Sequence, residues 1–468
     1  MKNNLQRSIM VAALIVSASF GNIAQAPAKA IVEELNVRAQ MQFLAGDSLQ
    51  GRGSGTQFER IAADYVGSQF MQFGLEPAGE NGADGKATYV QTASRVRNTF
   101  DGKPTVTIGD RVFEHGKDIL AIRVNSGQIA GGLQKIDLEG KPNENSAVFV
   151  RIPADKAAGN IFQLVQGLNS AGASIVLVEE TPSIRGNWTA FAERPLSFSS
   201  PAPGSRSAAV IVVSKDAASI IRGLSDGATI LFSGKTSTQT QQSWNAVGKI
   251  TGTDPMLGSE VILLSSHLDH LGVRPNAPGD DKIFNGADDD ASGTIAVLEL
   301  ARALAKGPTR PKRTIYFVCF GSEEMGGIGA TFFVNNLPFP KEKLVANLEF
   351  EMIGRPDAKV KAEELWLTGY ERSDLGPELA KRGAKLVQDP HPEENFFQRS
   401  DNYTLARQGI IAHTVSSFGL HTDYHKATDE VGTIDFAHMT RAINSMVAPV
   451  QWLVNSDFKP RWVEGMKP

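Results

Sequence analysis

Acidic residues and histidines stand in short clusters in the second half of the chain. The segment FNGADDDASGT places Asp288, Asp289 and Asp290 side by side among small residues. Adjacent carboxylates repel one another, and a buried carboxylate without a partner loses several kcal/mol or changes its pKa. A positively charged partner is therefore expected near this segment.

The other clusters each follow an apolar segment that is typical of a buried strand. The segments VILLSS, TIYFVCF, VANLEFEM and IIAHTVSS lead into or contain these polar residues. The residues are His267, Asp269, Glu323, Glu324, Glu351, His421, Asp423, His425 and Asp429. Because strands alternate with helices such as ASGTIAVLELARALAKG, we predict an α/β fold with a mainly parallel mixed sheet sandwiched by helices.

In such sheets, sites form at the carboxyl ends of the strands. Taken singly, each residue has an ordinary explanation, and we interpret His270 and His413 as ordinary polar residues and Asp290 as a helix cap. Solvated acidic residues have no reason to gather at strand ends, so their joint placement favours a metal site. Histidine and carboxylate donors suit zinc or a similar divalent ion, and two ions that share one carboxylate form a recurring hydrolytic site. One aspartate of the triplet is a candidate for the shared ligand.

The chain as a whole limits the remaining possibilities. Its 468 residues exceed the size of a single core, so more than one domain is expected. The net charge of −4 and the absence of Lys or Arg runs argue against a nucleic-acid partner. Residues 1–30 have the layout of a signal peptide, with cleavage expected after Ala30, and their apolar run is too short for a membrane span. We expect an exported protein, periplasmic or secreted, in which the single Cys319 excludes an internal disulfide.

Five motifs carry a family resemblance. The segments HLD, GADDDASG, EE after a strand, LEFEMIGR and YHKATD occur in this order. As a set they resemble the co-catalytic dizinc exopeptidases of metallopeptidase family 28, which includes aminopeptidases and glutamate carboxypeptidases. The segment 105–234, with short apolar strands such as SAVFVRI and AAVIVVS, resembles the protease-associated domain that many members insert. Residues 31–104 and 235–468 would then form the catalytic domain, which acts on peptides.

The resemblance implies a role for each polar residue. It implies two zinc ions per chain, bridged by Asp288, with His267 and Glu351 completing one site and Glu324 and His425 the other. It implies further roles for four residues: Glu323 as general base, Asp269 orienting His267, Tyr424 at the oxyanion, and Arg399 near the substrate terminus. A cis peptide between Asp288 and Asp289 is also expected. The chain departs from the family at Glu351, where many members have Asp, and at Asn402, where others often have His.

Three functions compete on this basis. An aminopeptidase uses an acidic group near the metals to hold a free α-amine. A carboxypeptidase-like peptidase or a glutaminyl cyclase would keep the fold, although cyclases of this fold typically use one zinc and a full two-metal ligand set argues against that reading. A non-enzymatic, receptor-like binding protein would have lost ligands or the base, and Glu323 is retained. The substrate residue, the oligomeric state and removal of a pro-segment are not determined by these features.

Overall fold

The computed structural model describes residues 32–152, 165, 168, 172–193, 196–198 and 208–468. The predicted signal peptide lies outside this range. No helix within the described residues has the length and apolar character needed to cross a membrane.

The larger of the two main sheets carries the strands that were expected to end in polar residues. Its four central neighbours β20 (Ala412–Ser416), β17 (Leu344–Phe350), β13 (Val261–His267) and β16 (Thr314–Phe320) are parallel. The sheet continues on one side with β18 (Leu365–Leu367) and β19 (Leu386–Gln388). On the other side it continues with β12 (Thr236–Ile250), β2 (Val90–Phe100) and β9 (Ser197–Phe198), and β1 (Glu76–Pro77) also pairs with β12. Because β18 and β12 join their neighbours antiparallel, the sheet is mixed and mainly parallel at its centre, which confirms the predicted fold class.

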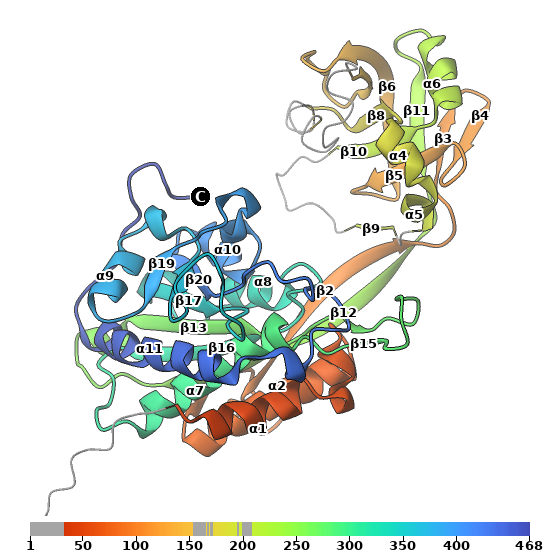
Figure 1. Ribbon diagram of the computed structural model, residues 1–468. Helices are drawn as coiled ribbons and strands as arrows, with labels where there is room; N and C mark the ends of the chain where they lie inside the picture. Colours follow the sequence, from red (N-terminus) through yellow and green to blue (C-terminus); the bar gives the residue numbers. More distant parts are fainter. Residues whose placement is uncertain (1–31, 153–164, 166–167, 169–171, 194–195, 199–207) are drawn as a thin grey trace, which may run out of the picture.

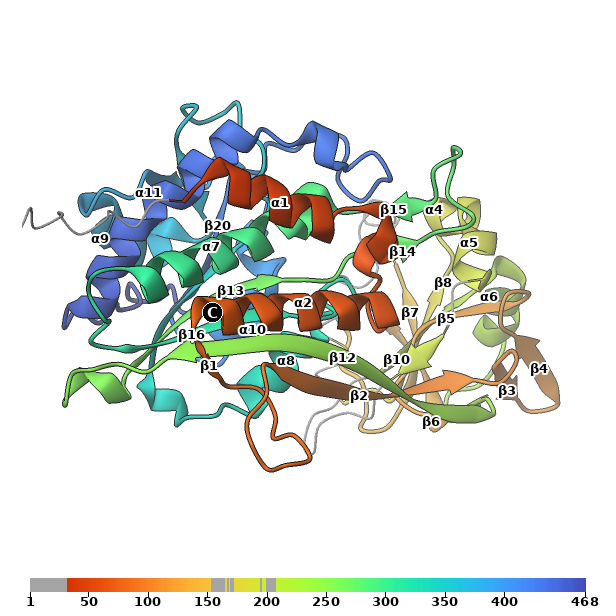
Figure 2. The same ribbon diagram turned by 90° about the horizontal axis from the view of Figure 1, so that it is seen from below.

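Helices cover both faces of this sheet because side chains alternate along each central strand. In β13, Ile262 and Leu264 pack into one apolar core, while Val261 and Leu263 pack into another on the opposite face. The first face is covered by α1 (Glu34–Leu44), α2 (Gln57–Phe73), α7 (Gly293–Lys306), α9 (Leu375–Lys381) and α11 (Phe436–Asn455). The second is covered by α8 (Ile328–Asn335) and α10 (Asp401–Ala406) (Figures 1 and 2).

A second sheet is built from the strands between β2 and β12. Its order is β4 (Arg111–Glu114), β3 (Thr105–Ile108), β11 (Thr229–Ser233), β6 (Gln128–Asp137), β7 (Ala147–Arg151), β8 (Ile175–Glu179), β10 (Ala209–Val213) and β5 (Ile119–Arg123). Helices α4 (Pro182–Gly186), α5 (Trp188–Glu193) and α6 (Lys215–Arg222) accompany it. This sheet has its own apolar core and lies at the far end of the long β2 and β12 pair in Figure 1.

The chain enters and leaves this second sheet at adjacent points. Strands β2 and β12 pair from Val90 with Ala246 to Phe100 with Thr236, and Thr105 then pairs with Ser233 inside the second sheet. These pairings support the division at residues 105–234, which we retain as a proposal. One strand departs from it, because β9 lies between these boundaries in the sequence yet pairs with β2 of the larger sheet.

Candidate metal centre

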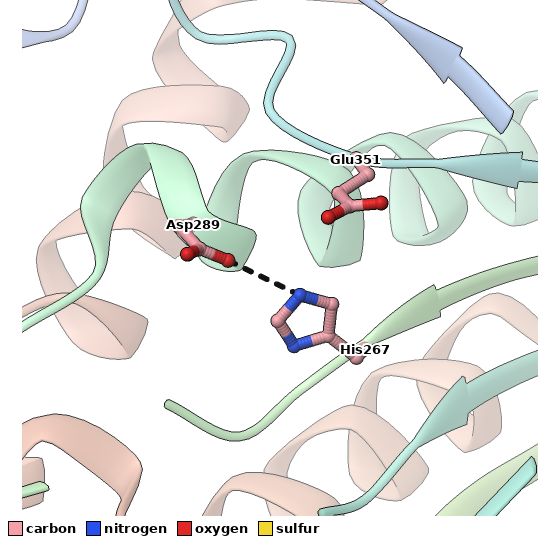
Figure 3. Close-up of side chains that lie close together, drawn as sticks. All are labelled: His267, Asp289 and Glu351. Atoms are coloured by element: carbon pink, nitrogen blue, oxygen red, sulfur yellow. Dashed lines mark ion pairs between the residues drawn. The ribbon is translucent and has the colours of Figure 1, made fainter. Parts of the chain in front are cut away.

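Three parallel strands deliver polar side chains to one edge of the larger sheet. His267 is the last residue of β13, Glu351 follows β17, and Glu323 and Glu324 follow β16 after a two-residue turn. The triplet 288–290 lies in the π-helical turn Ala287–Ser292, immediately before α7. Figure 3 shows His267, Asp289 and Glu351 side by side at this edge.

Two groups of potential ligands share one carboxylate. The first group is His267, Asp289 and Glu351, whose ligand atoms all lie within 4.8 Å of one another, with His267 Nε2 at 3.2 Å from Asp289 Oδ1. The second group is Asp289, Glu324 and the two histidines His270 and His425. Here His425 Nε2 lies 3.2 Å from Asp289 Oδ2 and 3.2 Å from Glu324 Oε2. Asp289 therefore presents one oxygen to each group.

The shared residue differs from the predicted one. Asp288 was expected to bridge the two sites, but its Oδ1 accepts a hydrogen bond from the Gly354 N–H at 2.7 Å and its Oδ2 lies 2.9 Å from His421 Nε2. The backbone at Asp289 (φ −103°, ψ 95°) and Asp290 (φ −129°, ψ 40°) departs from helical geometry, so successive side chains point in different directions. The bridging assignment therefore moves to Asp289, and the cis peptide joins Asp289 to Asp290 rather than Asp288 to Asp289.

Asp290 behaves as the sequence interpretation expects. Its Oδ1 accepts from the Gly293 N–H at 3.0 Å, three residues ahead, and from the Met352 N–H at 3.1 Å. Its Oδ2 accepts from the His267 N–H at 3.2 Å. Asp290 thus caps the start of α7 and ties β13 and the end of β17 together. The three aspartates have three different partners, and only Asp289 faces both groups.

Asp269 links the first histidine to the loop that carries the two glutamates. The Glu323 N–H donates to Asp269 Oδ1 at 2.9 Å, and the Ser54 hydroxyl donates to Asp269 Oδ2 at 2.5 Å. His267 Nδ1 lies 3.7 Å from Asp269 Oδ1, which is longer than a hydrogen bond. The predicted orienting role toward His267 is thus an electrostatic one in this geometry, and the firm contact is with Glu323.

Two buried residues from the N-terminal segment support these loops, and both were missed from the sequence. The Arg52 guanidinium donates to the carbonyl oxygens of Leu268 at 2.9 Å, Asn285 at 2.6 Å and Gly286 at 2.9 Å, so it joins the loop after β13 to the aspartate turn. Glu59 accepts from the Gly55 N–H at 2.6 Å and from the hydroxyls of Ser243 and Ser322, both at 2.9 Å. The segment LQGRGSGT, interpreted only as a Gly-rich turn, thus braces the site.

The buried polar atoms of the two groups fit a cation. Both ring nitrogens of His267 and His270, Asp289 Oδ2 and Glu324 Oε1 are buried without a well-aligned hydrogen bond, although such atoms are rarely left unpaired in proteins. Burial opposes ionisation of His267, yet the carboxylates of Asp269 and Asp289 outweigh burial and raise the pKa of this imidazole. Burial likewise opposes ionisation of Asp289, but the neighbouring histidines hold the pKa of its carboxyl well below the usual range. Imidazole and carboxylate donors in this number suit zinc.

An aromatic cavity adjoins the first group, since Glu351 lines it. Trp366, Phe396, Phe418 and Tyr424 also line it, together with Arg399. The Tyr424 ring stacks on the imidazole of His425, with centroids 3.9 Å apart. Arg399 pairs with Glu394 at 3.1 Å and lies over the Phe396 ring. The structure thus brings Tyr424 and Arg399 to the site, whereas the three other aromatic residues come from separate segments and were not predicted.

The fold and the site together define a class of protein. A shared aspartate between two histidine and carboxylate groups, at the strand ends of an α/β sheet, is typical of two-metal hydrolases. Residues 245–450 match the model of Peptidase family M28.

Comparisons of sequence and structure extend this assignment. An aminopeptidase of Pseudomonas aeruginosa (strain UCBPP-PA14) is 34% identical over 117 residues, which cover 25% of this chain but 19% of that protein. The solved aminopeptidase from Aneurinibacillus sp. strain AM-1 has a TM-score of 0.54 at 19% identity, covering 91% of this chain and 94% of that one. A zinc aminopeptidase from Bacillus subtilis gives a TM-score of 0.50 at 17% identity, covering 92% and 97%. The two structures show that the fold is shared along most of the chain.

Proposed function

We propose that this chain is an exported, zinc-dependent aminopeptidase that hydrolyses N-terminal residues from peptides. The observation that carries the proposal is the shared Asp289, with one oxygen at each group, and a Glu323 carboxylate close enough to interact electrostatically with His267. The match of residues 245–450 to Peptidase family M28, and the aminopeptidase names of the relatives, support it.

Each group supplies the donors that a zinc ion requires. His267, Asp289 and Glu351 would hold the first ion, and Asp289, Glu324 and His425 the second. Glu351 takes the place that Asp has in many family members, and it reaches the first group despite its extra methylene. When bound, a pair of zinc ions lowers the pKa of coordinated water from about 15.7 toward about 7 and polarises the scissile carbonyl.

Glu323 is the general base in this proposal. It belongs to neither group, and its backbone N–H is held by Asp269, so its carboxylate stays beside the ions without serving as a ligand. Burial raises the pKa of the Glu323 carboxyl well above the ordinary value, and the nearby carboxylates of Asp401 and Glu351 raise it further. A carboxyl group with a raised pKa can take a proton from water and keep it until the leaving amine accepts it.

The cavity beside Glu351 is the place for the substrate's first side chain. Its walls of Trp366, Phe396 and Phe418 favour an apolar side chain. The carboxylates at the metal edge would attract the free α-ammonium group. Tyr424 lines the same cavity, where its hydroxyl would stabilise the developing oxyanion, and Arg399 would contact the substrate near its terminus.

The remaining parts of the chain have accessory roles in this proposal. Residues 1–30 direct export and are removed. Residues 105–234 form an insert similar to a protease-associated domain, and we assign it to the selection of longer peptides. The catalytic domain consists of residues 31–104 and 235–468.

The test is hydrolysis of matched peptides with free and blocked N-termini by the purified mature protein, with and without chelator. We expect cleavage only of the free peptides, with loss in chelator and recovery on addition of zinc. A peptide with N-terminal glutamine, followed by mass spectrometry, separates hydrolysis from cyclisation. Activity confined to blocked peptides would exclude an aminopeptidase, and complete inactivity of the zinc-loaded protein would favour a binding protein.

A further inference from the structure

We propose that His270 is a fourth protein ligand of the second ion, which leaves the first ion as the one with an open position. The inference rests on the proposed two-ion centre and adds a donor that the five motifs do not contain. His270 stands three residues after His267, and the sequence interpretation treated it as an ordinary polar residue.

The distances around the second group support four ligands. His270 Nδ1 lies 2.8 Å from Glu324 Oε1 and 3.8 Å from Asp289 Oδ2, and His425 Nε2 lies 3.2 Å from an oxygen of each. Donors bound at about 2.0 to 2.2 Å to a tetrahedral zinc are about 3.3 to 3.6 Å apart. The four measured separations scatter around that spacing, and the ligand atoms of His270, Asp289 and Glu324 all lie within 4.8 Å of one another.

The imidazole of His270 is held in place by packing rather than by hydrogen bonds of its own ring. The residue is fully buried, and neither ring nitrogen has a well-aligned hydrogen bond. Its backbone N–H donates to the Arg52 carbonyl at 3.2 Å. Gly286, at φ +58°, gives the ring room, because a Cβ there would lie 2.5 Å from His270 Cγ. A histidine that is desolvated and has one ring nitrogen aimed at two carboxylates is suited to ligation.

The added ligand makes the two sites different in kind. The first group offers three protein donors and the second offers four. Zinc sites with four protein ligands are closed, whereas catalytic sites keep three protein ligands and one exchangeable position. The second ion would therefore be held more tightly and help to orient Asp289 and Glu324, while water or substrate would exchange at the first ion.

Metal affinity tests this assignment without reference to turnover. The full-length mature protein is stripped of metal and titrated with zinc against a chromophoric chelator, as wild type, His270→Ala and His391→Ala. His391 is the matched control, because it is also buried and lies 2.8 Å from one carboxylate, that of Asp357, but belongs to neither group. Loss of an outer partner of a metal ligand weakens binding about 10 to 100-fold, so loss of a direct ligand should exceed about 100-fold at one site.

A second variant identifies direct coordination. His270→Cys places a thiolate where Nδ1, the ring nitrogen nearer the backbone, now lies, and the longer zinc–sulfur bond of about 2.3 Å compensates for its shorter reach. Loaded with Co²⁺, this variant should show a near-ultraviolet thiolate-to-metal absorption that the wild type lacks, since the native Cys319 is buried outside both groups.

The outcomes separate this inference from the proposed function. Two ions in the wild type, with selective loss of one in His270→Ala and the thiolate band in His270→Cys, support the ligand. Two ions in the wild type with less than about 100-fold weakening in His270→Ala, or no thiolate band in His270→Cys, overturn it and leave the two-ion enzyme intact; His270 would then only hydrogen-bond Glu324. A single ion in the wild type would instead contradict the two-ion centre itself.

Discussion

Asparagine substitutions at the neighbouring residues Asp288 and Asp289 should have different effects, one on the stability of the fold and the other on zinc affinity. Asp289 offers one oxygen to each group, at 3.2 Å from His267 Nε2 and 3.2 Å from His425 Nε2. Asp289→Asn therefore removes a charged donor from both sites at once. Since loss of an outer partner weakens metal binding about 10 to 100-fold, we expect both affinities to fall by more than about 100-fold, which is above about 2.7 kcal/mol.

Asp288→Asn should alter the folded state instead of the metals. The Asp288 carboxylate accepts from the Gly354 N–H at 2.7 Å and lies 2.9 Å from His421 Nε2. Hydrogen bonds to a charged group contribute about 1.5 to 3 kcal/mol each, and the asparagine carbonyl retains one of them in a neutral form. We expect the free energy of unfolding to fall by about 2 to 3 kcal/mol, with both zinc affinities within tenfold of the wild type.

The assay for the pair is zinc titration against a chelator, with urea unfolding of the same preparations. If the Asp289→Asn variant bound two ions and the Asp288→Asn variant bound none, the bridging carboxylate would be that of Asp288, and the assignment to Asp289 would be wrong.

Three further outcomes are expected. Glu323→Gln should retain both metals and lose about 10² to 10⁴-fold in kcat, measured by steady-state kinetics and metal analysis; a near wild-type kcat would assign the base elsewhere. Burial raises the pKa of Glu59 from 4.5 to about 8, so the folded protein keeps a proton that the unfolded chain releases between these values, and the free energy of unfolding should fall as the pH rises through this window. Glu59→Gln should thus stabilise the protein more at pH 8 than at pH 5 in urea unfolding, and an equal effect at both values would contradict this pKa. Replacing residues 105–234 with a short Gly/Ser linker should leave zinc binding largely intact and change KM for peptides more than for an aminoacyl anilide, whereas loss of zinc would show that the insert is part of the core.

Two sequence patterns made the central part of the fold predictable: short apolar segments typical of buried strands, and polar residues directly after them. The strands that end at His267 and Phe320 show both patterns, and because they are parallel, their carboxyl ends lie at the same edge of the sheet. The long pairing of β2 with β12 and the return of β9 to the larger sheet were not foreseen. These strands are polar or very short, so hydrophobic periodicity gives little signal for them.

The sequence predicts which residues gather at the site better than it predicts the contacts that each residue makes there. Three consecutive aspartates are chemically equivalent in the sequence, and the turn geometry at Asp289 and Asp290 decides which one faces the histidines. Arg52 and Glu59 act across more than 180 residues of sequence, where no local pattern reveals a partner. His270 does leave a signal, because HLDHLG carries a second histidine three residues after His267.

The two oxygens of Asp289 have a consequence for the order in which the centre fills. An ion at either group would fix the orientation of the Asp289 carboxylate, which the other group also needs. The conformational entropy of that side chain would therefore be lost only once, when the first ion binds. The second ion to arrive would then bind to a preformed ligand, and by thermodynamic reciprocity each ion raises the affinity for the other by the same factor. Opposing this coupling is the repulsion between two dications, which the surrounding acidic side chains of Glu351 and Glu324 reduce. The balance between these terms would set whether the proposed two-ion centre fills in one step or in two.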